Sequence, residues 1–132
     1  MQAKQAKQAQ VLSREQEQTL MGYASRTRNP QRDRVMVLLS LKAGLRAHEM
    51  AGLTWAMVMD ANGQIGESLH LPDRVVKQRY GRTIPLHTDL AEALRALQDV
   101  RQEWATPERP IVFSERGGGL SAATVRLWFH RM

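Results

Sequence analysis

The chain has 132 residues, which is enough for one domain with a buried core. Its 19 Lys and Arg against 13 Asp and Glu give a net charge of +6, which favours nucleic acid or an anionic surface as a partner, although an ordinary solvated basic surface explains the charge equally well. The absence of cysteine excludes disulfide bridges and thiolate metal sites, and the scattered histidines form no pair at helical ligand spacing. No apolar run approaches the roughly 20 residues that cross a bilayer, and no apolar signal core begins the chain, so we expect a cytoplasmic protein without metal or membrane contact.

The N-terminus begins with a polar low-complexity tract that has no apolar face. We therefore expect residues 1–12 to be a disordered tail or a linker, and residues 13–132 to form the domain. Ser13 and Gln16 have the spacing of a capping box, which predicts a helix from there to about Ser25.

A second helix is predicted from Pro30 to Ala43, because Asn29 and the proline after it are a typical helix start. Its middle, Val35–Leu39, is apolar on nearly every side, so this should be the buried central helix. Gly44 fits the position after a helix where a positive φ is needed.

A small antiparallel sheet is predicted next. Residues 55–59 have the pattern of a first strand, residues 68–77 that of a second strand which Pro72 interrupts, and residues 82–86 that of a returning strand. Tyr80-Gly81 can form the turn before the returning strand.

A strongly amphipathic helix should follow the sheet. Thr88 is its expected N-cap, and its apolar positions continue at helical spacing to Trp104. Ile111–Phe113 should then form a short buried extended segment. Trp104, like Trp55 and Trp128, occupies a core-compatible position, so we interpret the tryptophans as packing residues rather than base-stacking platforms.

Ser121 should cap the last helix. The apolar stripe of that helix reaches the final residue, Met132, so we expect a truncated domain whose covering helices are missing. An apolar patch of that kind tends to be covered by another subunit. We therefore predict dimerisation or an exchanged C-terminal helix, because the patch would expose Val125, Trp128 and Phe129.

One arginine follows the helix-ending glycine on a short predicted helix. Arg46 and Glu49 occupy positions i and i+3, so they share a face of a helical turn. The guanidinium can offer a planar fork of donors to a phosphate while the carboxylate orients it. An ordinary surface ion pair between the two explains the spacing as well, and taken alone it is the preferred interpretation. His48 could also contact a phosphate, although a partly exposed helix histidine is the simpler interpretation.

Four basic residues surround the turn at Tyr80-Gly81, namely Arg74, Lys77, Arg79 and Arg82. They could form a charged, solvated edge that prevents aggregation. They could instead contact DNA phosphates, with the lysine acting as a general acid toward a leaving alkoxide.

Three segments, in this order, together resemble landmarks in the catalytic domain of tyrosine recombinases, the phage integrase family. The first resembles the first conserved box of that family, the second its β-hairpin lysine segment, and the third the landmark after the hairpin. The matching residues are Gly44-Leu45-Arg46-x-x-Glu49-Met50-x-x-Leu53-x-Trp55-x-x-Val58, then Lys77-x-x-x-Gly81-Arg82-Thr83-Ile84-Pro85-Leu86, then Phe113 with Leu120-Ser121-x-x-Thr124-Val125.

This resemblance implies an α+β, mainly α fold, in which a helical domain carries a small three-stranded antiparallel sheet. It implies an enzyme that cuts and rejoins double-stranded DNA through a phosphotyrosine intermediate, without metal, nucleotide or other cofactor. By the same resemblance, Arg46 would bind the scissile phosphate and stabilise its developing charge, Glu49 would support the arginine, and Lys77 would protonate the leaving 5′ oxygen. Further DNA contacts are expected from Arg74, Arg79, Arg82 and His48.

The second half of the sequence departs from the family pattern. The His-x-x-Arg box and a later His or Trp are absent, and His130-Arg131 has the wrong spacing. Neither Tyr23 nor Tyr80 matches the position of the nucleophile. We therefore expect the N-terminal two-thirds of a catalytic domain from a phage-type or mobile-element integrase, able to bind DNA and unable to cleave it.

Two alternatives stay open. A non-catalytic DNA-binding or regulatory protein could have kept an integrase-like fold, and codons for the missing box and tyrosine directly after residue 132 would argue against it. A helical interaction module could carry an accidental basic face, and its DNA binding would survive replacement of Arg46 and Lys77.

Overall fold

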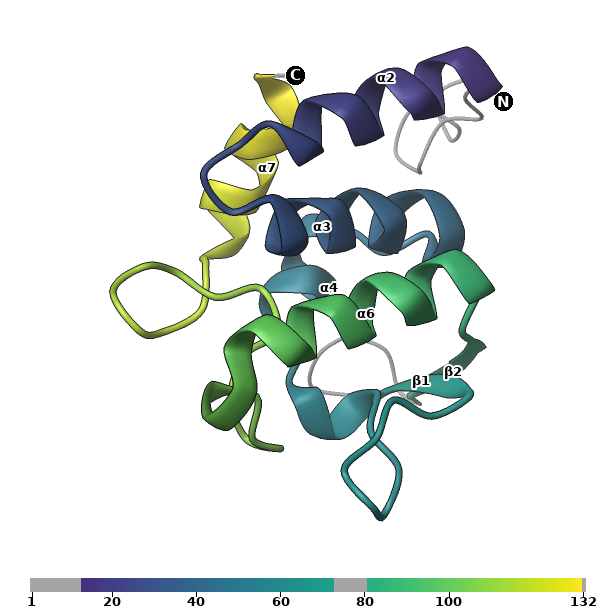
Figure 1. The fold of residues 1–132 in the computed structure, drawn as a ribbon, viewed down its shortest axis with the longest axis vertical. Coiled ribbons are helices and arrows are strands. Elements are labelled where there is room, and N and C mark those ends of the chain that lie inside the picture. Colours follow the sequence, from purple (N-terminus) through teal and green to yellow (C-terminus); the bar gives the residue numbers. More distant parts are fainter. Residues whose placement is uncertain (1–12, 73–80, 132) are drawn as a thin grey trace.

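The computed structural model describes residues 13–72 and 81–131 (Figure 1). This part of the chain is mainly helical with one small antiparallel sheet, which confirms the α+β, mainly α fold class. The elements in chain order are α2 (Arg14–Ser25), α3 (Pro30–Ala43), α4 (Ala47–Ala51), η1 (Trp55–Met57), β1 (Ser68–Leu71), β2 (Arg82–Pro85), α6 (Thr88–Arg101), η2 (Gln102–Trp104) and α7 (Ala122–His130). The tail or linker expected over residues 1–12 lies outside the described residues.

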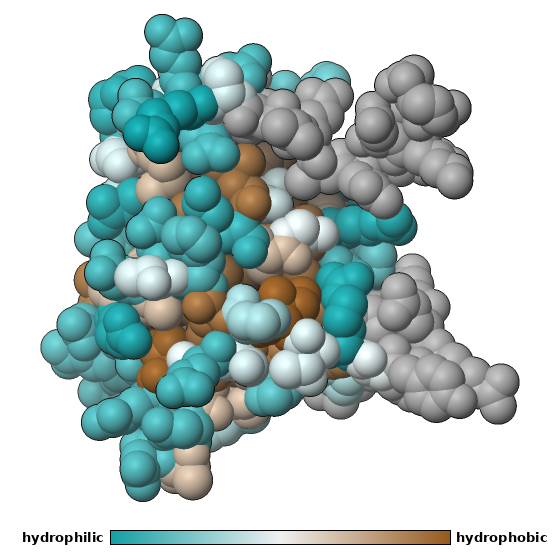
Figure 2. All heavy atoms as spheres, turned by 90° about the vertical axis from the view of Figure 1, so that its right-hand side faces the viewer, coloured by the Kyte–Doolittle hydropathy of each residue, from teal (hydrophilic) through white to brown (hydrophobic). Residues whose placement is uncertain are grey.

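Three helices form a layer in which α3 packs against α2 on one side and α6 on the other (Figure 1). All of Val35–Leu39 is buried, which confirms α3 as the central helix. The strands lie beneath α6 in this view, and α7 packs against α4. On the side where α3 ends and α6 begins, hydrophilic side chains predominate and apolar side chains show between them (Figure 2). Within the described ranges, no helix is long and apolar enough to cross a membrane.

The ends of α2 and α3 follow the sequence signals. The Ser13 side chain accepts a hydrogen bond from the Gln16 N–H at 3.1 Å, and the Gln16 side chain accepts one from the Ser13 N–H at 2.9 Å, which confirms the capping box. Gly44 has a φ of 67° after the last residue of α3, as predicted.

One further N-cap agrees with the prediction in position, and one differs from it. Asn29 is the N-cap of α3 as expected, but its side chain makes no capping hydrogen bond, and its amide nitrogen donates to the Glu115 carboxylate at 3.0 Å. The N-cap of α6 is His87, whose Nδ1 accepts from the Asp89 N–H at 3.0 Å, so Thr88 is the first helical residue rather than the cap.

The sheet has two strands, β1 and β2, and the prediction of a third strand over residues 55–59 is wrong for the described chain. Trp55 instead begins the 3-10 helix η1. Its N–H donates to Arg109 O at 3.1 Å and that of Ala56 donates to Pro107 O at 2.9 Å, so a loop distant in sequence takes the hydrogen bonds that a neighbouring strand would need. Within residues 55–59, Met59 alone forms an isolated β-bridge, with Ile65.

The first strand of the pair is shorter than predicted. β1 spans Ser68–Leu71, and the part of the expected strand from 73 to 77 lies outside the described residues. The returning strand, β2, agrees with the prediction, and its residues pair with β1 from Ser68↔Pro85 to Leu71↔Arg82.

The C-terminal end of α6 places one tryptophan at the surface. Gln102 adopts a positive φ of 49° and ends the regular helix. Trp104 therefore falls outside the apolar stripe and is 45% exposed, so its interpretation as a core residue is wrong. Trp55, in contrast, is fully buried.

The last helix is partly covered by the described chain. Ser121 caps α7 as predicted, by accepting from the Thr124 N–H at 3.1 Å. Val125 is fully buried because α7 packs against α4, so the expectation that this residue is exposed is wrong. Trp128 and Phe129 are partly buried against the core.

Candidate phosphate-binding site

Residues 44–49, here called the Arg46 turn, are held in place by backbone hydrogen bonds and by a buried leucine. The Gly44 N–H donates to Ser40 O and the Leu45 N–H donates to Leu39 O, both at 3.1 Å, which closes the end of α3. Leu45 is 4% exposed and belongs to the core, whereas Arg46 is exposed. The chain thus presents Arg46 at the surface directly after a buried residue, as the N-cap of α4.

Glu49 joins this turn to the sheet. It is only 4% exposed, and its Oε1 accepts from the backbone N–H of Arg46 at 2.9 Å and from Nη2 of Arg82 at 3.3 Å. The side-chain ion pair expected between Arg46 and Glu49 is therefore not the one observed. Glu49 caps the backbone of α4, and its charge is paired with Arg82.

Arg82 occupies an inward position at the start of β2. Side chains alternate along a strand, so Arg82 and Ile84 share the partly buried face, while Thr83 and Pro85 lie on the exposed face. Ile84 packs against the core. The alternation of side chains along this strand is the sequence signal that Arg82 points inward. Arg82 therefore differs from the other basic residues with which it was grouped, and it can reach a buried carboxylate.

The predicted site residues are only partly located. The structure brings Arg46, Glu49 and Arg82 together. Lys77, Arg74 and Arg79 lie outside the described residues, and their roles stay predictions.

His48 lies on α4 next to Glu49 and is partly buried. Its Nε2 is buried and has no hydrogen-bond partner in the described part of the chain. Its contact with a phosphate stays a prediction.

A second group of arginines, the arginine–aromatic cluster, comprises Arg32, Arg101, Trp104, Arg109 and Phe113. The Arg101 guanidinium carbon lies 3.7 Å from the centre of the Phe113 ring, and that of Arg109 lies 4.4 Å from the centre of the Trp104 ring. Burial, and then the nearby charge of Arg109, lowers the pKa of Arg101 below its ordinary value. Arg101 lies at the C-terminal end of α6, whereas Arg46 follows the C-terminal end of α3.

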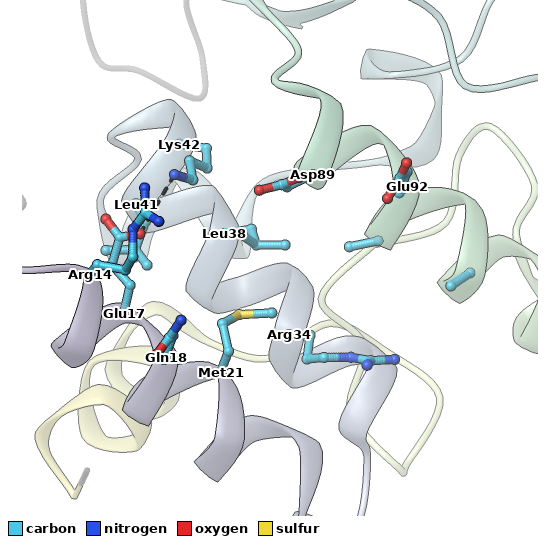
Figure 3. A pocket seen from close by; sticks show the side chains of 12 residues that line it. Arg14, Glu17, Gln18, Met21, Arg34, Leu38, Leu41, Lys42, Asp89 and Glu92 are labelled. Carbon is cyan, nitrogen blue, oxygen red and sulfur yellow. Dashed lines mark ion pairs between the residues drawn. The ribbon is translucent and has the colours of Figure 1, made fainter.

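A groove of about 590 Å³ lies between α2, α3 and α6 (Figure 3). Its walls carry both signs of charge, and Lys42 forms an ion pair with Glu17 at 3.7 Å. Asp89 and Glu92 add carboxylates from α6, so this groove is poorly suited to a phosphate. Across residues 13–72 and 81–131, no group of three or more acidic or histidine side chains is arranged to hold a metal ion.

The sequence matches the model of the phage integrase family over residues 10–132. Comparison with curated proteins and with solved structures gives no match. The matched range contains the Arg46 turn, the hairpin and α7, and it covers nearly the whole chain. The chain therefore belongs to the phage integrase family, whose tyrosine recombinases act in DNA recombination.

Proposed function

We propose that this chain is the DNA-binding part of a site-specific tyrosine recombinase, and that it holds duplex DNA in the cytoplasm through backbone phosphates. The observation that carries the proposal is the Arg46 turn. An exposed arginine stands on a backbone that a buried glutamate and a buried leucine hold in place. A guanidinium on a fixed backbone loses less conformational freedom when it binds a phosphate.

Within the described residues, no carboxylate pairs with the charge of Arg46. Among the ion pairs of the described residues, none involves Arg46, whereas Arg82 is paired with Glu49. Together with the surplus of basic residues in the chain, this supports a phosphate ligand rather than an internal partner.

In the complete reaction Arg46 would stabilise the charge on the non-bridging oxygens of the scissile phosphate. A tyrosine oxygen would form the bond to phosphorus as the bond to the 5′ oxygen breaks, and Lys77 would give that oxygen its proton. The remaining phosphate contacts are proposed for Arg74, Arg79 and His48. Because neither tyrosine of this sequence matches the nucleophile position, we propose that the chain alone binds DNA without cleaving it.

Binding to a labelled duplex, followed by fluorescence anisotropy at several salt concentrations, tests this function. The logarithm of the association constant should fall linearly with the logarithm of salt concentration, by roughly 0.9 for each phosphate contact. Arg46→Ala should weaken binding about tenfold and reduce that slope by about one contact. Arg95→Ala, which removes an exposed arginine of α6, is the matched control and should change little. A salt-independent interaction would contradict the proposal.

A suicide DNA substrate, which traps covalent intermediates, tests the lack of cleavage. We expect no protein–DNA adduct on a denaturing gel. An adduct that disappears in Tyr23→Phe or Tyr80→Phe would show that one of these tyrosines is a nucleophile after all.

The second candidate function is that of a non-catalytic DNA-binding or regulatory protein with an integrase-like fold. Both candidates predict the same DNA binding. The codons that follow residue 132 separate them, because a His-x-x-Arg box and a tyrosine there belong to the enzyme.

We also propose self-association through α7. Leu127 is 47% exposed on this helix, and Trp128 and Phe129 are only partly covered. Light scattering should show a dimer that Leu127→Glu disrupts. A monomer at high concentration would contradict this part of the proposal.

A further inference from the structure

We propose that Arg82 is a positioning residue, which acts through Glu49 to hold the start of β2 against the Arg46 turn, rather than a ligand of DNA phosphate. The inference rests on the proposed function, because the Arg46 turn matters as a phosphate-binding element. It assigns Arg82 a role different from that of the other basic residues around the hairpin.

One carboxylate oxygen makes the connection. Oε1 of Glu49 accepts both the Arg46 N–H and the Arg82 guanidinium, and Arg82 lies 33 residues away in the sequence. The Glu49 side chain is 5% exposed and that of Arg82 is 37% exposed. An ionised carboxylate so deeply buried needs a compensating partner, and Arg82 supplies it.

The backbone next to Arg82 fixes the position of this residue. Arg82 pairs with Leu71 across the two strands, and Gly81 precedes it. A Cβ built on Gly81 would clash with the carbonyl oxygen of Leu71 and lie 3.2 Å from Cα of Pro72. Only glycine permits this close approach. The start of β2 therefore has one defined position, which places Arg82 next to Glu49.

The geometry opposes a phosphate role for Arg82. Its Nε is buried and lacks a partner among the described residues, and its Nη2 is on Glu49. With Nη2 on Glu49 and Nε buried, only Nη1 would remain for a phosphate, and a movement of Arg82 away from Glu49 would leave a buried carboxylate unpaired. Ion pairing also reduces the charge that Arg82 could offer to a phosphate. The residue is therefore better placed to orient Arg46 than to contact DNA.

The test is a double-mutant cycle in DNA affinity with Arg82→Gln and Glu49→Gln, read from duplex anisotropy across salt concentrations. Arg82→Gln alone should weaken binding about tenfold. In the Glu49→Gln background the same change should have less than about a twofold effect, because the link is already broken. If Arg82 is a phosphate ligand, Arg82→Gln should reduce the affinity by the same factor in both backgrounds and lower the salt slope by roughly 0.9 in each. That result would overturn the inference.

Rescue and control variants distinguish positioning from loss of fold. Arg82→Lys keeps a positive charge for Glu49 and should recover most of the affinity. Arg95→Gln removes an exposed arginine without a role in the link and should leave affinity unchanged. An Arg82→Lys variant as weak as Arg82→Gln would contradict the ion-pair mechanism.

Hydrogen exchange of the Arg46 amide gives a readout that needs no DNA. That N–H donates to Glu49, so Arg82→Gln should speed its exchange about tenfold, while the Leu39 amide in buried α3 stays protected. Unchanged exchange at Arg46 would overturn the inference even if DNA binds. Faster exchange in a protein that does not bind DNA would instead refute the proposed function and leave the positioning role standing.

Discussion

Two arginine environments in this protein differ in what holds the guanidinium. At the Arg46 turn, Arg82 is held by the carboxylate of Glu49, which also binds backbone. In the arginine–aromatic cluster, Arg101 and Arg109 lie over the rings of Phe113 and Trp104.

The two environments should respond differently to substitution. A carboxylate neutralises charge and fixes direction, so the Arg46 turn should be rigid and sensitive to single substitutions. An aromatic ring does not neutralise a guanidinium, so the contacts of Arg101 and Arg109 with their rings should tolerate change better. Four substitutions test this contrast.

The largest effect is expected at Glu49. Glu49→Ala removes the acceptor of the Arg46 N–H and leaves Arg82 without its carboxylate, so the free energy of unfolding should fall by about 3 kcal/mol. Urea denaturation followed by circular dichroism measures it. Glu92→Ala, at an exposed position of α6, should change stability by less than about 0.5 kcal/mol. Equal losses in the two variants would remove the contrast between the regions.

The next effect is expected at Gly81, which lets the Arg82 link be disturbed without any change of charge. Gly81→Ala forces β2 away from the Leu71 carbonyl and should cost about 2 kcal/mol. Gly118→Ala is the matched control, because nothing lies within 4 Å of a Cβ there. Thermal unfolding of both variants checks the prediction, and an equally stable Gly81→Ala protein would contradict it.

A smaller effect is expected in the arginine–aromatic cluster. Trp104→Ala removes a ring that is 45% exposed and lies beneath the Arg109 guanidinium, so it should cost about 1 kcal/mol. Trp104→Phe keeps a ring and should recover part of that loss. A loss from Trp104→Ala as large as that from Glu49→Ala would show that aromatic contacts hold arginines as firmly as the carboxylate does.

The smallest effect concerns the fully exposed Glu108, close to the arginine–aromatic cluster. A hydrogen bond from the Thr106 hydroxyl is the main cause of its lowered pKa, with the charge of Arg109 contributing. A lowered folded-state pKa stabilises the protein above the unfolded-state value, and this contribution disappears as pH falls through the folded-state value. Thr106→Ala should therefore raise the pKa of Glu108 toward its ordinary value in an NMR titration. Thr19→Ala, in α2, should leave it unchanged.

Local signals in the sequence predicted local structure well. Ser13, Gly44 and Ser121 each act within one turn of their own helix, and all three end or begin helices as predicted. The apolar run Val35–Leu39 predicted the central helix correctly, because a helix that is apolar on all sides has to be buried.

Features that depend on distant residues were not predicted. Residues 55–59 have strand-like composition, but their hydrogen-bond partners lie in the loop near Arg109, which no local pattern reveals. The pairing of Glu49 with Arg82 is equally remote, so sequence spacing suggested Arg46 as the partner instead. Trp104 continues a helical pattern that Gln102 has already ended.

The hydrogen bonds between residues 53–56 and 107–111 also have a consequence for the order of folding. The N–H groups of Trp55 and Ala56 bond to carbonyls of this later segment, and the Ile111 N–H returns a bond to Leu53 O at 3.1 Å. On a ribosome, the chain just after α4 must wait for these partners to be synthesised. We therefore expect residues 53–56 to gain these hydrogen bonds only after residues 107–111 have left the exit tunnel.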